Sequence, residues 1–172
     1  NLVNSSGVIA SDTTGVGTAR ETPGAASYGT DKAIFAYGYN GSASVSLKNL
    51  VSNLGVVAAD VTGVGTTRYA LAAAGYGGDK AIFGYGYSGG GVSLTNLVNN
   101  SGVVAADVTG VGTARQNLTA ASYGGDKALF GYGGSNASMT NLVSSSGVVS
   151  TDVTGVGTGR VSLGAAGFST SA

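Results

Sequence analysis

The chain has 172 residues, enough for one domain to bury an apolar core without disulfides. Eight basic and eight acidic residues leave no net charge, so the chain lacks the positive field that binds nucleic acids, and no apolar run is long enough for membrane insertion. Cysteine and histidine are absent, which removes thiolate nucleophiles, the commonest general base and the commonest metal ligands from the possible chemistry.

The sequence consists of four similar units. The tripeptide Asn-Leu-Val begins at residues 1, 49, 96 and 141, an Asp follows it eleven residues later, and an Arg follows that Asp after eight more. We therefore expect a single repeat domain over residues 1–172, with units starting at 1, 49, 96 and 141 and the last unit incomplete. The first residue is Asn1 rather than Met, which indicates a processed or excised piece.

In chain order, the first two elements expected around the second unit are strands at residues 45–51 and 55–61. Residues 45–51 alternate, with Val45, Leu47 and Val51 on one face, which is the period of a strand. Residues 55–61 are apolar on both faces, which predicts a strand that is covered on two sides.

The next two expected elements form a hairpin. Residues 72–76 are small up to a terminal Tyr, and residues 80–87 predict a strand with Ala81, Phe83, Tyr85 and Tyr87 on one side. Between them, Gly77-Gly78-Asp79 is a turn signal because Gly readily adopts positive φ. Helices are not expected, since Gly, Thr and Val occur throughout and no capped helical period is present.

Four short strands in each unit predict an all-β fold of tandem repeats, a small β-propeller of about four blades. The small-residue strand at 72–76 favours the propeller because the innermost strands converge on its axis. A β-solenoid or a fibre-forming repeat array is the alternative. The last unit predicts a strand at residues 165–168, so the two termini would join in a composite blade or leave an edge for a neighbouring molecule.

The repeats resemble two known families. Residues 115–134, RQNLTAASYGGDKALFGYGG, resemble a kelch repeat, and residues 78–90, GDKAIFGYGYSGG, resemble the corresponding part of an RCC1-type repeat. Both families are β-propellers, so the resemblance implies that fold. The units are also similar to Gly-rich tandem repeats of phage and environmental surface proteins, which implies an extracellular or virion-surface location.

Fourteen of the sixteen charged residues occupy fixed positions of the repeat. A charged residue that recurs in every unit is expected to stabilise the fold of the unit, whereas a catalytic site needs one particular group of residues at one place. We therefore expect these charged residues to be structural and the protein not to be an enzyme. Each Asp begins an Asp-x-Thr-Gly turn in which we expect it to accept local hydrogen bonds, while each Arg joins adjacent units and at least two are buried. The spacing of a calcium loop is absent, so we expect no metal or cofactor. The Asp and Arg of this pattern are Asp12, Arg20, Asp60, Arg68, Asp107, Arg115, Asp152 and Arg160.

A candidate binding face follows from where the units differ. Unit length changes only in the loops at 40–44, 88–91 and 134–137, and the stretch after each Arg is the most divergent segment of fixed length. In a meander these two connections lie at the same end of the strands, where repeat proteins often bind partners. A Tyr at the start of such a loop can stack on a sugar ring. The candidate residues are Tyr39, Asn40, Tyr87, Ser88, Ser135, Asn136, Glu21, Tyr69 and Gln116.

These observations favour a non-enzymatic structural or adhesive repeat module of a virion or an extracellular assembly. A carbohydrate- or protein-binding β-propeller domain is the alternative. The expected partners are further copies of the chain, other structural proteins or glycans, and not nucleic acid.

Overall fold

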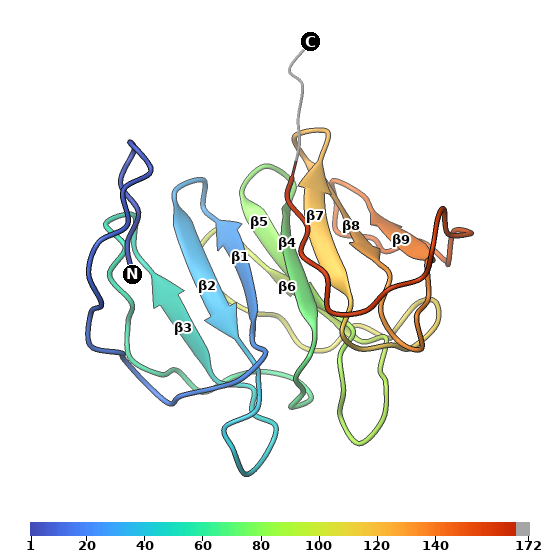
Figure 1. Ribbon diagram of the computed structural model, residues 1–172, viewed down its shortest axis with the longest axis horizontal. Helices are drawn as coiled ribbons and strands as arrows, with labels where there is room; N and C mark the ends of the chain where they lie inside the picture. The colour runs from blue at the N-terminus through green and yellow to red at the C-terminus, as the bar shows by residue number, and fades with distance from the viewer. Residues whose placement is uncertain (168–172) are drawn as a thin grey trace.

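The computed structural model describes residues 1–167, and in this range it contains strands, turns and irregular segments but no helix, so no helix there could cross a membrane. The expected all-β fold is confirmed. The strands form three antiparallel sheets that lie side by side (Figure 1). The sheets consist of β1 (Gly24–Tyr28), β2 (Lys32–Ala36) and β3 (Lys48–Val51); β4 (Ala72–Tyr76), β5 (Lys80–Gly84) and β6 (Thr95–Val98); and β7 (Thr119–Tyr123), β8 (Lys127–Gly131) and β9 (Thr140–Val143).

Each sheet has the same order and register. The middle strand pairs with both neighbours, so that Ile34 of β2 lies opposite Ala26 of β1 and Leu50 of β3. The predicted hairpin turn is present between β4 and β5, where Gly77 and Gly78 have φ values of 60° and 78°. The third strand of each sheet carries the Asn-Leu-Val that opens the next unit, so every sheet joins two consecutive units.

The segment at 55–61 is not a regular strand covered on two sides, and that prediction was wrong. It contacts β3 through two isolated bridges, Val51 with Val57 and Lys48 with Val61. Between these bridges the side-chain amide of Asn49 donates to the carbonyl of Ala58, which interrupts the backbone ladder. The segment forms the outer edge of the sheet, and Val56 is 63% exposed there.

The strand at 80–87 is also shorter than predicted. It ends at Gly84 because Tyr85 has a φ of 63°, in the left-handed region. This turn of the backbone moves Tyr85 to the other face of the sheet. Ala81 and Phe83 belong to the core cluster between the first and second sheets, whereas Tyr85 belongs to the cluster between the second and third. The predicted alignment of all four side chains on one face was therefore wrong.

The first strands of the three sheets, β1, β4 and β7, lie next to one another at the centre of the molecule. Their small side chains permit this approach. A Cβ on Gly75 would lie 3.4 Å from the hydroxyl of Ser122 and 3.6 Å from the carbonyl of Ser27. The expected central position of the small-residue strand is confirmed.

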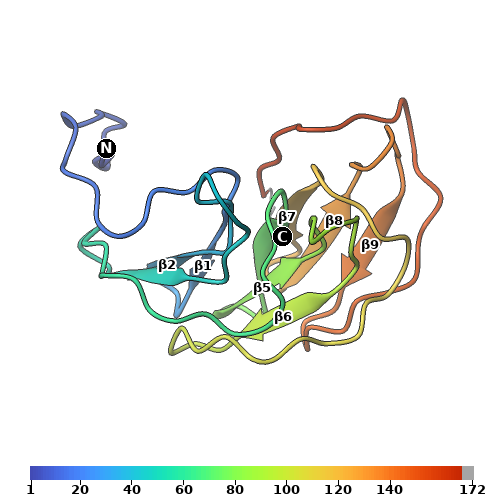
Figure 2. The same cartoon turned by 90° about the horizontal axis from the view of Figure 1, so that it is seen from below.

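The two ends of the chain do not pair within the described residues. The N-terminal segment, residues 1–20, contains a bridge between Val3 and Ile9 and lies beside the first sheet, while residues 161–167 run along the third sheet (Figure 2). Residues 165–167 of the expected last strand are irregular, and Phe168 lies outside the described residues. The three sheets form an arc that is open between these two segments, so the expected composite blade is not formed there.

Candidate binding face

The repeated Arg residues fix the segments that carry the candidate face. Arg68 is fully buried; its Nε donates to the carbonyl of Tyr85 at 2.9 Å, and its Nη2 donates to Asn96 Oδ1 at 2.6 Å. Its guanidinium lies 4.1 Å from the ring centre of Tyr37, on the preceding sheet. Arg115 is buried in the equivalent contacts. The prediction of at least two buried Arg residues that join units is confirmed.

The Asp residues also join units, which corrects the expectation of local hydrogen bonds. Asp60 accepts hydrogen bonds from the backbone N and the hydroxyl of Thr18, 42 residues earlier, at 2.8 and 2.7 Å, and from Asn49 at 2.9 Å. These bonds from Thr18 and Asn49 hold the pKa of Asp60 below its usual value. The preceding unit can come this close because residue 17 is Gly. Any side chain at this position would collide with the carboxylate of Asp60. Asp107 and Asp152 have equivalent Thr partners.

The network is weaker at the two ends of the array. Arg20 is half-buried and bonds the carbonyl of Leu47 at 2.6 Å, whereas Arg160 is exposed beside Tyr132. Asp12 bonds the side chain of Asn1. The four Arg residues therefore occupy related positions, and only the two inner ones have the complete set of contacts.

The backbone brings the two variable segments of each unit together, as predicted from their parity. Tyr69 and Tyr87 exchange two hydrogen bonds of 3.2 and 2.8 Å, and Glu21 and Tyr39 exchange two of 2.8 and 3.0 Å. Gly86 is required for this pairing, because its φ is 109° and a Cβ there would lie 2.8 Å from the carbonyl of Tyr69.

The resulting feature is a tyrosine row, which consists of Tyr39, Tyr69 and Tyr87. The ring centres of Tyr39 and Tyr69 are 5.5 Å apart, and those of Tyr69 and Tyr87 are 5.3 Å apart. The rings are tilted by 53° and 55°, and both separations lie within the range of about 4.5–7 Å that aromatic pairs favour. All three side chains are half-buried, so the row is a supported surface rather than three free side chains. Glu21 pairs with Tyr39 at one end of the row.

The third unit extends this face with a groove that has a mixed polar and apolar lining. Gln116 and Gly134 take the places of the paired tyrosines, joined by a hydrogen bond of 2.7 Å from the Gly134 N to the Gln116 carbonyl. A groove of about 410 Å³ lies beside them, and its lining includes Gln116, Ser135 and Met139. Gly91, which pairs with Tyr87, also lines the groove and places it next to the row.

The loops that differ in length stand around this face. The loop at 40–44 and the loop at 88–91 project from the lower edge of the molecule in Figure 1. Asn40 is exposed, and its Oδ1 accepts hydrogen bonds from the backbone N of Ser42 and Ala43 at 3.0 and 2.9 Å, which orders the first loop. Ser135 and Asn136 are exposed in the third loop, and Ser88 is half-buried in the second.

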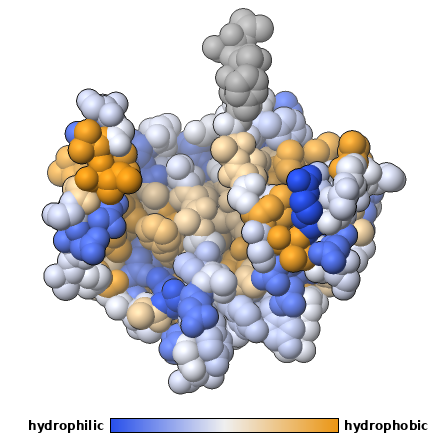
Figure 3. Space-filling model, viewed as in Figure 1, coloured by the Kyte–Doolittle hydropathy of each residue, from blue (hydrophilic) through white to orange (hydrophobic). Residues whose placement is uncertain are grey.

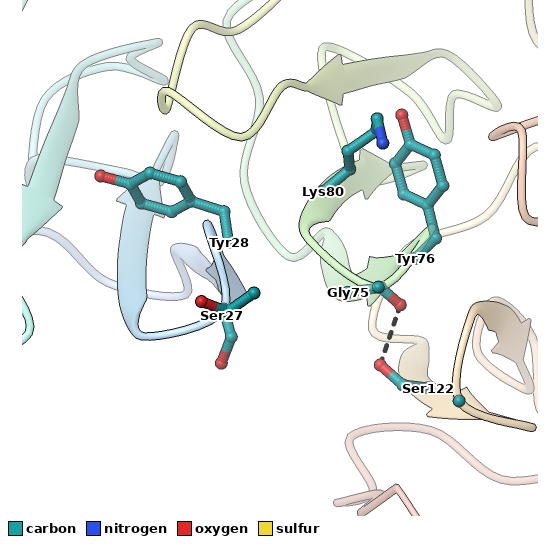
Figure 4. Close-up of a pocket in the computed structure, with 9 residues that line it drawn as sticks. Ser27, Tyr28, Gly75, Tyr76, Lys80 and Ser122 are labelled. Carbon is teal, nitrogen blue, oxygen red and sulfur yellow. Dashed lines mark hydrogen bonds between the residues drawn. The ribbon is translucent and has the colours of Figure 1, made fainter.

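A second, smaller cavity lies among the first strands of the three sheets. It has a volume of about 150 Å³ and is lined by Ser27, Gly75 and Ser122, with Tyr28, Tyr76 and Lys80 at its side (Figure 4). Ser122 donates to the Gly75 carbonyl at 2.8 Å across it. This hydrogen bond fastens neighbouring sheets, and the cavity adds no residue to the candidate face.

Comparisons with known proteins do not extend these observations: no family model and no curated protein matches the chain. The function must therefore be inferred from the site itself.

Sequence reasoning identified the members of the tyrosine row but missed the residues that hold it. Tyr37 and Tyr85 stack on the buried Arg residues, and Asn49 and Asn96 link Arg to Asp. Their fixed spacing from the Arg and Asp was visible in the repeat, and that spacing was the available signal.

Proposed function

We propose that this protein is a non-enzymatic adhesive repeat module that binds an extended carbohydrate chain on the tyrosine row, within an extracellular or virion-surface assembly. The observation that carries the proposal is the row itself. Three half-buried tyrosine rings from two units follow one another with ring centres 5.3–5.5 Å apart, next to a groove with a mixed polar and apolar lining. Successive tyrosine rings can contact successive sugar units of a carbohydrate chain.

The chemistry of the face favours a neutral polar ligand. Tyr offers a rigid apolar ring with a hydroxyl and loses little side-chain entropy on binding. The surrounding loops supply amide and hydroxyl groups from Asn40, Ser135 and Gln116. Glu21 is the only charged residue among the candidate residues of this face. Sugar rings present apolar faces and hydroxyl edges, which match this combination.

The use of the charged residues supports the absence of catalysis. Asp60, Asp107 and Asp152 each accept hydrogen bonds from a Thr of the preceding unit, and Arg68 and Arg115 are enclosed between sheets. These groups stabilise the array. Arg68 precedes Tyr69 in the chain and Arg115 lines the neighbouring groove, but their guanidinium groups are engaged by the carbonyls of Tyr85 and Tyr132 and by Asn side chains.

The fold that we propose is an open β-propeller. Small first strands at the centre, sheets that pack face to face, and a fourth segment outside each third strand all support blades of an open β-propeller similar to kelch and RCC1-type repeats. A solenoid would instead pair strands of successive coils, and strand pairing within residues 24–143 stays inside each sheet.

The proposal is tested by glycan binding with matched tyrosine variants. The protein is applied to a panel of immobilised neutral and acidic oligosaccharides, together with Tyr69→Ala and Tyr123→Ala. Tyr123 is a half-buried tyrosine at the opposite end of the strands and serves as the control. We expect Tyr69→Ala to weaken binding about ten-fold, which corresponds to about 1.4 kcal/mol, and Tyr123→Ala to bind normally. Equal binding by both variants, or no binding by the unaltered protein, would contradict the proposal.

A further inference from the structure

An apolar groove lies between the N-terminal segment and the first sheet. It has a volume of about 620 Å³, and its lining includes Leu2, Val16, Phe35 and Val57. Apolar side chains of the N-terminal segment gather at the upper left of Figure 3. Phe35 is 39% exposed, whereas the equivalent Phe83 and Phe130 are fully buried. The groove therefore leaves exposed a surface of the first sheet whose equivalents on the second and third sheets are covered.

The neighbouring sheets show what covers this surface. Phe83 packs edge-on against Tyr37 of the preceding sheet with ring centres 5.5 Å apart, and Phe130 packs against Tyr85 at 5.1 Å. Ile34 of the preceding sheet joins the same cluster as Phe83. The covering side chains come from the hairpin formed by the first two strands of a sheet and from the Tyr that directly follows it.

The N-terminal segment supplies only the outer part of such a sheet. A Cβ on Gly102 would meet both Leu50 and Tyr28, and one on Gly147 would meet both Leu97 and Tyr76. At the equivalent Gly55 the three nearest atoms all belong to Leu2. Leu2 takes the place of the third-strand leucine, and residues 1–167 provide no counterpart of the hairpin tyrosine.

Two polar groups mark the place of a second tyrosine. The hydroxyls of Tyr37, Tyr85 and Tyr132 each donate to the carbonyl of the Val in the Gly-Val-Gly segment, at 3.0, 3.0 and 3.2 Å. The equivalent carbonyl is that of Val16, which lines the groove. Each of these tyrosine rings also stacks on an Arg, and Arg20 holds the equivalent position. No ring lies over Arg20 among the described residues.

We propose that this groove binds a β-hairpin of the same repeat class. The hairpin places one tyrosine against Leu2 and Gly55, an aliphatic side chain against Phe35, and a second tyrosine between Arg20 and the Val16 carbonyl. The groove thus selects the pattern of small-residue strand, Gly turn and Ile-containing strand followed by Tyr. This site lies apart from the tyrosine row and is independent of carbohydrate binding.

The test uses a hairpin peptide added to the intact protein. A fluorophore-labelled peptide with the sequence of residues 69–87 is titrated with the protein, and anisotropy is recorded. We expect saturable binding, a higher melting temperature of the protein in the presence of the peptide, and at least ten-fold weaker binding of a peptide that carries Ile82→Asp and Tyr85→Ala.

Protein variants locate the site. Phe35→Asp and Leu2→Asp, each confirmed as folded by circular dichroism, should weaken peptide binding at least ten-fold. Val103→Asp changes a 56%-exposed side chain outside the groove and should bind the peptide as the unaltered protein does. Equal affinity of the three variants, or no binding by the unaltered protein, would overturn the proposal. Self-association that Phe35→Asp abolishes, without any peptide binding, would also overturn it, because the occupant would then be the surface of a second copy.

Discussion

At the scale of single residues, the fold depends on a buried guanidinium that the repeat places between units. Arg68 contacts Tyr37, Tyr85 and Asn96, which belong to different strands or connections. The fixed spacing of Arg in the sequence was enough to predict burial and a structural role. It could not predict the partners, because these lie 17 to 31 residues away and are set by how the sheets pack.

Replacing this arginine should therefore be costly. Arg68→Ala leaves the buried Asn96 Oδ1 and the Tyr85 carbonyl without their donor, and we expect the free energy of unfolding to fall by about 3–5 kcal/mol. Arg160→Ala, at the exposed end of the array, should cost about 0–1 kcal/mol. Urea titration followed by circular dichroism measures both. Similar losses in the two variants would show that the burial of Arg68 is unimportant.

Replacement of a single turn residue should increase the stability of the protein. Thr30 has a φ of 69°, where the equivalent turns have Gly78 and Gly125 with φ values of 78° and 80°. A β-branched residue is strained in this region, so Thr30→Gly should raise the free energy of unfolding by about 1 kcal/mol. The reverse change, Gly78→Thr, should lower it by a similar amount, since nothing lies within 4 Å to offset the strain. The idea fails if Thr30→Gly lowers the urea midpoint.

At the scale of elements, local sequence signals located the glycine turn and its first strand, but they missed where a side-chain hydrogen bond or a left-handed residue interrupts or ends a strand. The Gly77-Gly78 turn was predictable from the conformational freedom of Gly, and the strand at Ala72–Tyr76 was predictable from its place before that turn in the repeat. The outer segment was not, because the amide of Asn49 takes over a position in the backbone ladder. The face formed by the two variable connections was predictable, since parity in a meander fixes which connections meet.

The pairing of these connections should depend on Gly86. Gly86→Ala places a methyl group 2.8 Å from the Tyr69 carbonyl at a φ of 109°, so we expect a loss of about 1–3 kcal/mol and weaker glycan binding together. Gly89→Ala is the matched control, because its φ of 76° is also positive but nothing lies within 4 Å. It should cost about 1 kcal/mol and leave binding intact. Thermal melts and the oligosaccharide panel measure the two effects, and intact binding by a folded Gly86→Ala variant would contradict the role of this glycine.

At the scale of the whole molecule, stability should have an acid limit and an alkaline limit. Hydrogen bonds from Thr18 and Thr113 hold the pKa values of Asp60 and Asp152 below the ordinary value of 3.8, so their contribution is complete above about pH 4 and is lost as the pH falls through the folded values. Burial raises the pKa of Tyr85 to about 12 from 10.0, so its contribution is complete below pH 10 and is lost as the pH rises toward 12.

The melting temperature should therefore be nearly constant between about pH 5 and 9, and it should fall on both sides of that range. Asp60→Asn should flatten part of the acid decrease and leave the alkaline decrease unchanged. Differential scanning calorimetry across pH 2 to 12 measures both limits. A melting temperature that increases as the pH is lowered below 4 would contradict the stabilising role of these hydrogen-bonded carboxylates.

The tyrosines allow the proposed binding face to be observed directly. The chain has nine of them: Tyr28, Tyr37, Tyr39, Tyr69, Tyr76, Tyr85, Tyr87, Tyr123 and Tyr132. With ¹³C-labelled tyrosine rings, an NMR titration with the best oligosaccharide from the panel would report on every ring at once. The structure predicts shifts at Tyr39, Tyr69 and Tyr87 and none at Tyr28, Tyr76 and Tyr123, which lie at the other end of the strands. Shifts confined to the latter three rings, or spread evenly over all nine, would contradict the assignment of the tyrosine row as the binding face.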